Sequence, residues 1–292
     1  MAEENEVPDR EVDVHAEAAL VAEAQTLGEE ERWDEAHSLL VEALDEHGES
    51  ALLLCWAGIA SQRLGNDSEA YDFYRRALSL QPEDAFVLAA AGSGVAVFDD
   101  PDAEGALRMA ALTAPDFPFA RAAYGAYLAR EGLFAEAVAE LEAARGLAPE
   151  DADVQADLGM AYLLAGRRDD GLGALEEALA LRSDDGWLRG VYGLALVEAR
   201  RTEEGAEQLH RAASERVEDV ELQLLCALAS AGEGWADEAW NAVARAEAAA
   251  DSSDREMIEE VEEAIEEGDE AIAVLRDDLA PSLLRERLLQ RA

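Results

Sequence analysis

The side chains best suited to catalysis or metal binding are few, and their spacing builds no site. They are four histidines and two cysteines: His15, His37, His47, His210, Cys55 and Cys226. The histidines show neither the short spacing of a zinc site nor a cysteine partner of the kind used in nucleophilic catalysis. The cysteines lie far apart in the sequence, so we expect both to stay reduced rather than form a disulfide. The sequence therefore predicts no catalytic residue, no metal ion and no other cofactor.

Acidic residues dominate the charge of the chain. Asp and Glu number 67, the basic residues number 23 and are all Arg, and the formal net charge is −44. Carboxylates in such numbers usually form solvated helix faces rather than catalytic pairs. No glycine-rich loop of the phosphate-binding kind is present. We therefore expect a protein without enzymatic activity. Binding to nucleic acid or to an anionic membrane is disfavoured, because both require concentrated positive charge.

Three explanations of the acidity remain open: a salt-rich cytoplasm, a basic partner, or a biased nucleotide composition in the source. The chain has no apolar run of the roughly 18 residues that a membrane-spanning helix requires. Its first residues also lack the basic and apolar regions of a secretory signal. We expect a cytoplasmic location.

The stretch 51–84 shows the element from which the rest of the chain is built. Apolar and small residues recur at helical spacing in its first half, a break follows at Leu64–Asp67, and a second helical pattern ends before Pro82. Gly65 suits the end of the first helix. Such a helix pair cannot cover its own apolar faces alone, so it needs neighbours of the same kind.

A small residue in the first helix of this pair recurs every 33 or 34 residues. The recurring positions are Gly58, Gly92, Gly125, Gly159, Gly193 and Ala227. A second set marks the start of the second helix: Ala36, Ala70, Ala103, Ala137, Gly171, Gly205 and Ala239. Small residues at fixed positions let antiparallel helices approach closely.

With this period the chain resembles the tetratricopeptide repeat family. The resemblance implies an all-α, right-handed superhelical solenoid with a general role in protein binding. We expect repeats at 17–50, 51–84, 85–117, 118–151, 152–185, 186–219 and 220–251, after an acidic leader at 1–16 and before capping helices and a basic tail at 252–292. Two features depart from the family pattern. Leu20, Leu54 and Leu88 replace an early aromatic residue, and the third repeat lacks one residue near 98–102.

In arrays of this family the first helix of each repeat lines the concave groove, so the resemblance implies a set of groove residues. They are Cys55, Ile59, Arg63, Phe86, Phe119, Arg130, Met160, Leu163, Trp187, Leu194, Leu224 and Leu228. An apolar groove of this kind accepts an extended peptide or an amphipathic helix. Phe86, Phe119 and Trp187 are the expected anchors. In the competing interpretation the helical register is shifted by one residue, and many members of the set belong to the core.

We expect a non-enzymatic scaffold or adaptor that binds an apolar or amphipathic, possibly basic, segment of a partner protein. Two alternatives remain open: a chaperone-like holder of unfolded clients and a self-assembling array. The last segment, 282–292, is rich in Leu and Arg. It is interpreted either as a closing cap helix or as a segment that docks into the groove of its own or a neighbouring chain and so forms a homo-oligomer.

Overall fold

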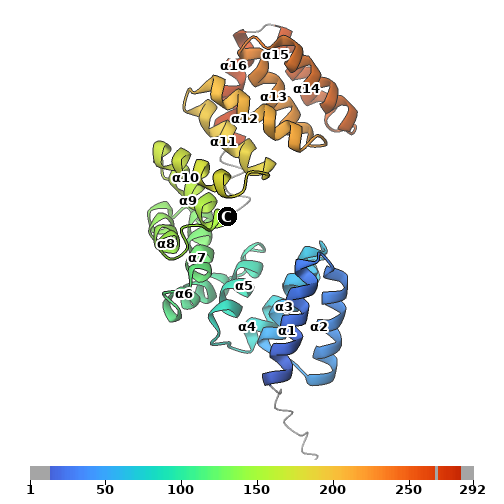
Figure 1. Cartoon of the computed structure of the whole chain (residues 1–292), viewed down its shortest axis with the longest axis vertical. Helices are drawn as coiled ribbons and strands as arrows, with labels where there is room; N and C mark the ends of the chain where they lie inside the picture. The colour runs from blue at the N-terminus through green and yellow to red at the C-terminus, as the bar shows by residue number, and fades with distance from the viewer. Residues whose placement is uncertain (1–13, 267–268, 284–292) are drawn as a thin grey trace, which may run out of the picture. The chain divides into compact units, whose positions relative to one another are not determined.

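The computed structural model describes residues 14–266 and 269–283, and every regular element in these ranges is helical. The first seven helices are α1 (Val14–Glu29), α2 (Trp33–His47), α3 (Ala51–Arg63), α4 (Asp67–Ser79), α5 (Ala85–Ala96), α6 (Ala103–Thr113) and α7 (Pro118–Arg130). The next seven are α8 (Phe134–Leu147), α9 (Ala152–Leu164), α10 (Arg168–Leu181), α11 (Gly186–Glu198), α12 (Thr202–Glu215), α13 (Val220–Gly232) and α14 (Ala236–Ala249). Then come α15 (Arg255–Glu266), α16 (Asp269–Ala273) and the π-helix η1 (Val274–Leu279) (Figure 1).

The chain divides into two compact units, residues 1–127 and 128–292, and α7 crosses from one to the other. In the first unit α1 packs on α2, α3 on α4 and α5 on α6; in the second, α9 packs on α10, α11 on α12 and α13 on α14. These helix pairs confirm the predicted all-α repeat solenoid. The first helix begins at Val14, inside the range assigned to the acidic leader. Most of the Leu- and Arg-rich tail, residues 284–292, lies outside the described residues.

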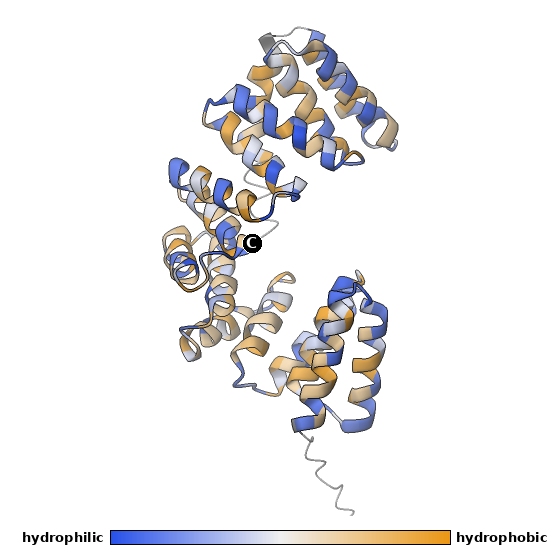
Figure 2. Ribbon diagram, in the orientation of Figure 1, coloured by the Kyte–Doolittle hydropathy of each residue, from blue (hydrophilic) through white to orange (hydrophobic). Residues whose placement is uncertain are grey.

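The ends of the helices follow from a few residues that recur with the repeats. Asp84, Asp151, Asp185 and Asp219 each accept hydrogen bonds at the start of a first helix from backbone amides of its first turn. The first helix ends before a residue in the left-handed region, which is Gly65 (φ 76°) in the second repeat. The second helices α2, α4, α6, α8, α10, α12 and α14 begin without a side-chain cap. Most helices carry hydrophobic and hydrophilic residues together, as expected for one buried and one solvated face (Figure 2).

The small residues of the period lie where a large side chain of another helix is closest. Tyr74 on α4 is buried between Gly58 on α3 and Gly94 on α5, and its hydroxyl donates a hydrogen bond to Gln62 Oε1 at 2.9 Å. In the second unit Gly159 lies against Leu175. The glycines therefore set how closely the helices of one repeat, and of neighbouring repeats, approach each other.

The one-residue deletion in the third repeat is accommodated by a turn fixed through a buried carboxylate. Asp100 accepts hydrogen bonds from the Tyr71 hydroxyl at 2.8 Å and from the Asp102 amide at 2.9 Å, and its Oδ2 lies 3.4 Å from Arg75 Nη1. Asp99, immediately before it, has a φ of 53°. The Asp100 carboxylate, which interacts with all three of these donors, thus holds the turn after α5 onto α4.

Consecutive repeats are joined by a polar contact with the same period. A side chain in the first helix donates to the backbone carbonyl six residues earlier, in the preceding loop: Arg121 to Pro115 at 2.6 Å, Gln155 to Pro149 at 3.1 Å, Arg189 to Ser183, and Gln223 to Val217 at 3.4 Å. In the second and third repeats the equivalent residues are Leu54 and Leu88, whose side chains have no donor. We call these four contacts the loop clamps.

Candidate functional site

Four aromatic residues of the first unit form a continuous row. The rings of Trp56 and Phe86 are stacked with centroids 5.4 Å apart, those of Phe86 and Phe119 are 5.9 Å apart, and those of Phe119 and Phe117 are 5.8 Å apart. We call these residues the aromatic row. Trp56 lies on α3, Phe86 on α5 and Phe119 at the start of α7, while Phe117 immediately precedes α7, so each of three successive first helices contributes one ring.

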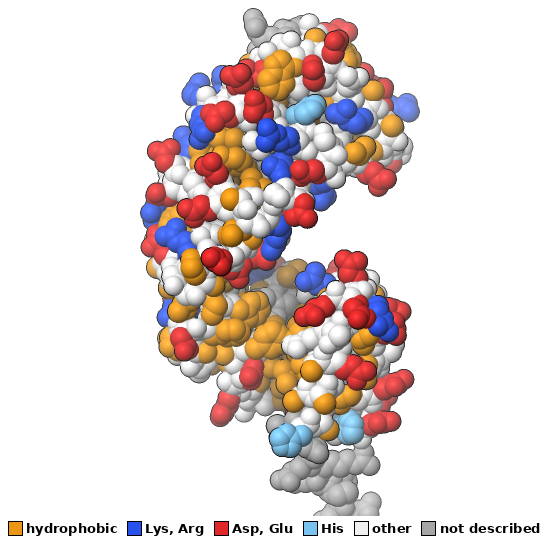
Figure 3. Space-filling model, viewed as in Figure 1, with side chains coloured by type: hydrophobic (Ala, Val, Ile, Leu, Met, Phe, Trp, Pro, Cys, Tyr) orange, Lys and Arg blue, Asp and Glu red, His pale blue; other side chains and the backbone are white. Residues whose placement is uncertain are grey.

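The aromatic row is partly open to solvent. Trp56, Phe86 and Phe117 are half-buried, whereas the side chain of Phe119 is 41% exposed. Ile59 and Tyr127, also half-buried, pack against the same hydrophobic cluster as Trp56 and Phe86. Hydrophobic side chains gather over the α4–α7 part of the first unit, while acidic side chains are spread over both units (Figure 3). The row can therefore bury further apolar surface without a change of fold.

Part of the predicted groove set belongs to the core instead, and this corrects the prediction. Cys55, Met160, Leu194, Leu224 and Leu228 are all nearly or fully buried. Cys55 sits on the flank of α3 that packs toward its neighbours, one residue from Trp56, whose ring is half-exposed. In the second unit η1 packs on α11 and α13, and α16 packs on α13. The chain's own C-terminal helices therefore lie on the first helices that carry Leu194, Leu224 and Leu228.

The remaining predicted groove residues have mixed environments. Phe86 and Phe119 belong to the aromatic row, with Ile59 beside it. Leu163 and Trp187 are half-buried against the core of the second unit. The guanidinium of Arg63 lies 5.5 Å from the ring centroid of Trp33, so it takes part in a cation–π contact. Arg130 is half-buried at the end of α7.

Sequence reasoning missed Trp56, Phe117 and Tyr127. A signal was present, because large aromatic residues occur near the start or middle of the first helix in three successive repeats. The expected register instead places Cys55, one residue before Trp56, in the groove. A shift of one residue turns a side chain by about 100° around a helix, which is enough to move it from the surface to the core.

The two thiols of the described residues are buried. Burial, followed by the negative charge of Asp84, raises the pKa of the Cys55 thiol to about 12, and burial also raises the pKa of Cys226. Thiols held protonated in this way are poor nucleophiles. No group of three or more His, Cys, Asp or Glu residues with the geometry of a metal site occurs in residues 14–266 and 269–283.

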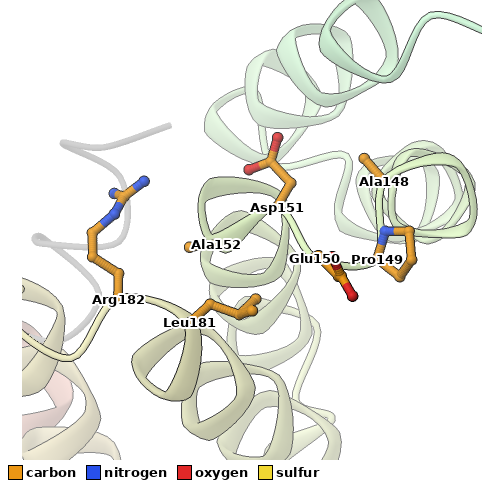
Figure 4. A pocket seen from close by; sticks show the side chains of 7 residues that line it. All are labelled: Ala148, Pro149, Glu150, Asp151, Ala152, Leu181 and Arg182. Carbon is orange, nitrogen blue, oxygen red and sulfur yellow. The ribbon is translucent and has the colours of Figure 1, made fainter.

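A hollow of about 680 Å³ on the second unit is also explained by the fold. It lies between the loop Ala148–Ala152 and the end of α10 at Leu181 and Arg182 (Figure 4). The side chain of Asp151 accepts hydrogen bonds from backbone amides in the first turn of α9. The guanidinium of Arg182 donates two hydrogen bonds to the carboxylate of Asp153, of 2.8 and 2.7 Å. The polar groups around this hollow therefore hold the helices together.

No helix within the described ranges is long and apolar enough to cross a membrane.

Comparison with solved structures identifies the fold. A tetratricopeptide repeat protein of Thermus thermophilus matches with a TM-score of 0.52 and 23% identity, over 62% of this chain and 98% of that one. The chain has the tetratricopeptide repeat fold. The Cut9–Hcn1 hetero-tetramer of the APC/C gives a TM-score of 0.68 at 16% identity, over 83% of this chain and 48% of that one. PilF of Pseudomonas aeruginosa gives 0.57 at 20% identity, over 67% and 89%. The sequence matches no family model and no curated protein.

The tetratricopeptide repeats explain why the aromatic row is continuous. Phe86 and Phe119 occupy the same position in two successive first helices, and stacking of the repeats brings them side by side, with Trp56 and Phe117 packed at either end. The arrangement suits binding through ring faces and edges, and it contains no group that would transfer a proton or activate a nucleophile.

Proposed function

We propose that the protein is a non-enzymatic adaptor whose first unit binds an apolar or amphipathic segment of a partner protein on the aromatic row. The observation that supports this most is the unbroken contact from Trp56 through Phe86 and Phe119 to Phe117, with Phe119 substantially exposed. Aromatic anchors in a row of this kind carry much of the binding energy in protein interfaces.

The charge of the protein sets the second part of the proposal. With a net charge of −44, the protein attracts and orients a segment that has Arg or Lys beside its apolar residues. The apolar residues of the segment then supply most of the affinity. Association should therefore slow at high salt, while dissociation changes much less.

Trp187, the third anchor expected from the sequence, is not part of the surface proposed for the first unit. It lies in the second unit, half-buried against that unit's core. The proposal accordingly rests on Phe86 and Phe119, with Trp56 and Phe117 added.

A peptide library displayed on phage and selected against the full chain tests the proposal. We expect selected peptides to combine large apolar residues with Arg or Lys. Phe119→Ala should weaken the binding of a selected peptide by about tenfold or more, as for an aromatic anchor at the centre of an interface. Phe98 provides the matched control, because it is a Phe of the same unit with 44% exposure that contacts Tyr71 and lies outside the row.

Phe98→Ala should leave the affinity within about twofold of the parent chain, as is usual for residues outside an interface. Equal losses for Phe119→Ala and Phe98→Ala would show that general surface hydrophobicity, not the row, binds the peptide. Normal binding by both variants would place the binding surface elsewhere. Circular dichroism of each variant checks that the helices are intact.

A further inference from the structure

The rings of the aromatic row cover part of one another's faces. Phe86 contacts Trp56 and Phe119, which come from the preceding and the following first helix. The plane of Phe86 is inclined by 23° to that of Trp56 and by 32° to that of Phe119, with centroids 5.4 and 5.9 Å away. At these distances and small angles the rings are offset-stacked, with their faces turned toward each other. The half-buried ring of Phe86 therefore meets solvent mainly through its edge.

The most exposed ring of the row also has two ring neighbours. Phe119, which is 41% exposed, contacts Phe86 and, at 5.8 Å and an interplanar angle of 57°, Phe117. The two inner rings of the row thus each spend their faces on contacts within the row. What remains for a partner is a strip composed largely of ring edges.

Elsewhere in the same unit, arginine side chains do use ring faces. The guanidinium of Arg63 lies 5.5 Å from the ring centroid of Trp33, and that of Arg76 lies 5.4 Å from the ring centroid of Phe73. No Arg among the described residues makes such a contact with a ring of the aromatic row. A cation requires the face of a ring, because the negative part of the ring quadrupole is there. The aromatic row therefore offers little to an Arg or Lys side chain placed directly on it.

Ring edges attract a different set of side chains. The edge of an aromatic ring is the positive part of its quadrupole, so the negative face of a second ring packs well against it in a T-shaped contact. The polarizable sulfur of Met also contacts rings favourably at the edge. A Leu, Ile or Val side chain buries apolar surface at the same place but gains no such attraction.

We infer that the aromatic row selects a partner segment whose anchoring side chains are Met or aromatic, bound through the ring edges of Phe86 and Phe119. The Arg or Lys residues of the segment lie beside the row and not over its rings. The inference rests on the adaptor function proposed above and specifies the side chains that the partner must supply.

The composition of selected peptides gives the first test. The phage library is selected against the full parent chain, and only peptides that lose binding to the Phe119→Ala chain are counted. Relative to the unselected library, we expect Met, Phe, Tyr and Trp to be enriched about twofold to tenfold more than Leu, Ile and Val, the factor that one edge contact contributes. Equal enrichment of the two groups would overturn the inference.

Isosteric side chains in one selected peptide give a sharper test without changing the protein. Norleucine replaces the sulfur of Met by a methylene group, and cyclohexylalanine replaces the ring of Phe by a saturated one. Burial alone predicts equal or tighter binding of these peptides, because they are at least as apolar. Edge contacts predict binding about twofold to tenfold weaker for each replacement, measured by fluorescence anisotropy with the parent chain. Equal or tighter binding would contradict the role of the ring edges.

Removing one ring from the row should remove the preference while the surface stays apolar. In the Phe86→Leu chain the affinity ratio between the parent peptide and its isostere should fall toward one, and Phe119→Leu, at the more exposed position, should act in the same way. Phe98→Leu is the matched control, because Phe98 is 44% exposed, contacts Tyr71 and lies outside the row. An unchanged ratio in folded Phe86→Leu and Phe119→Leu chains would refute the assignment of the edges to these rings.

The same measurements separate this inference from the proposed function. Peptides that require Phe119 but bind equally well with norleucine or cyclohexylalanine would leave the adaptor proposal standing and refute only the selection by ring edges. If no selected peptide required Phe119, the adaptor proposal would fail, and the inference would fail with it.

Discussion

Replacing Gly94 by Ala would press a methyl group against the ring of Tyr74. A Cβ atom built at Gly94 lies 2.2 Å from Tyr74 Cδ2 and Cε2, far inside van der Waals contact. The ring has little room to withdraw. On its other side Gly58 is also close, since a Cβ there would lie 2.6 Å from Tyr74 Cε1, and the hydroxyl is held by Gln62. The extra methyl group must therefore move α5 relative to α4.

Two effects of opposite sign set the size of the change. Ala in place of Gly inside a helix stabilises it by about 0.5–1 kcal/mol, because less backbone entropy is lost on folding. Overpacking of a buried site costs about 1–3 kcal/mol, and a contact as short as this one belongs at the upper end. We expect Gly94→Ala to lower the free energy of unfolding by about 1–2 kcal/mol.

Gly105 on α6 provides the matched control in the same unit. A Cβ atom there meets nothing within 4 Å, so Gly105→Ala should raise the free energy of unfolding by up to about 1 kcal/mol. Urea denaturation followed by circular dichroism at about 222 nm, the signal of helix, measures both variants. Opposite signs are expected for two chemically identical substitutions.

A stabilising effect of Gly94→Ala equal to that of Gly105→Ala would refute the reasoning. The double variant Gly94→Ala with Tyr74→Leu gives an independent check, since a smaller side chain leaves space for the methyl group. The cost of Gly94→Ala should then largely disappear in the Tyr74→Leu background, a coupling of about 1 kcal/mol or more between residues in contact. Additive effects would mean that the two residues do not meet.

Two further predictions concern buried ionisable groups. The pKa of Cys55 is raised to about 12 in the folded chain from an ordinary value of 9.0. As the pH rises, the thiol therefore loses its proton in the unfolded chain before it does so in the folded chain. The stability that depends on the protonated thiol is present below pH 9.0 and is lost as the pH rises toward 12. The Cys55→Val chain should therefore lose less stability than the parent chain between about pH 9 and pH 10.5. A thiol reagent should label Cys55 of the parent chain only in denaturant. Rapid labelling of Cys55 in the native chain would contradict its burial. Burial raises the pKa of Asp100, but the Asp102 amide, the Tyr71 hydroxyl and Arg75 together hold this pKa below its usual range. The stability that the ionised carboxylate contributes is therefore present above the pKa of Asp100 in the unfolded chain. It is lost as the pH falls through the pKa of Asp100 in the folded chain. Asp100→Asn should cost about 1–2 kcal/mol at neutral pH in urea denaturation and reduce the loss of stability on acidification from about pH 5 to pH 3; an unchanged acid transition would show that the carboxylate is not held as described.

The repeat architecture was predictable because it depends on residue type at a fixed period. Gly58, Gly159 and Gly193 each stand against a large side chain of the second helix, Tyr74, Leu175 and Leu209. Helix pairing and repeat length follow from such local patterns. The polar residues of the loop clamps show the same period, but they stand at the early first-helix position where the family pattern has an aromatic residue, so that pattern gives no signal for them.

The binding surface was predictable only in part, because it depends on angles and on contacts distant in sequence. Phe86 and Phe119 follow from their position in the repeat. Cys55 and Trp56 are adjacent in the sequence, and only the packing of α3 decides which of the two side chains is exposed. Leu224 and Leu228 were expected in an open groove. The helices that cover their side of α13 follow some 40 residues or more later and lie outside the repeat period.

The loop clamps determine where a repeat of this protein can be cut, copied or exchanged. Each donor lies in a first helix, and its acceptor carbonyl lies in the loop before that helix, as with Gln155 and Pro149. A transferable segment must therefore carry the loop together with the helix that follows it. Recombination or duplication at the loop's upstream edge, near Ala148, preserves the contact, whereas a joint at the start of α9 separates donor from acceptor. Repeats whose equivalent residue is leucine, such as Leu54 or Leu88, have no such side-chain donor and lack this constraint.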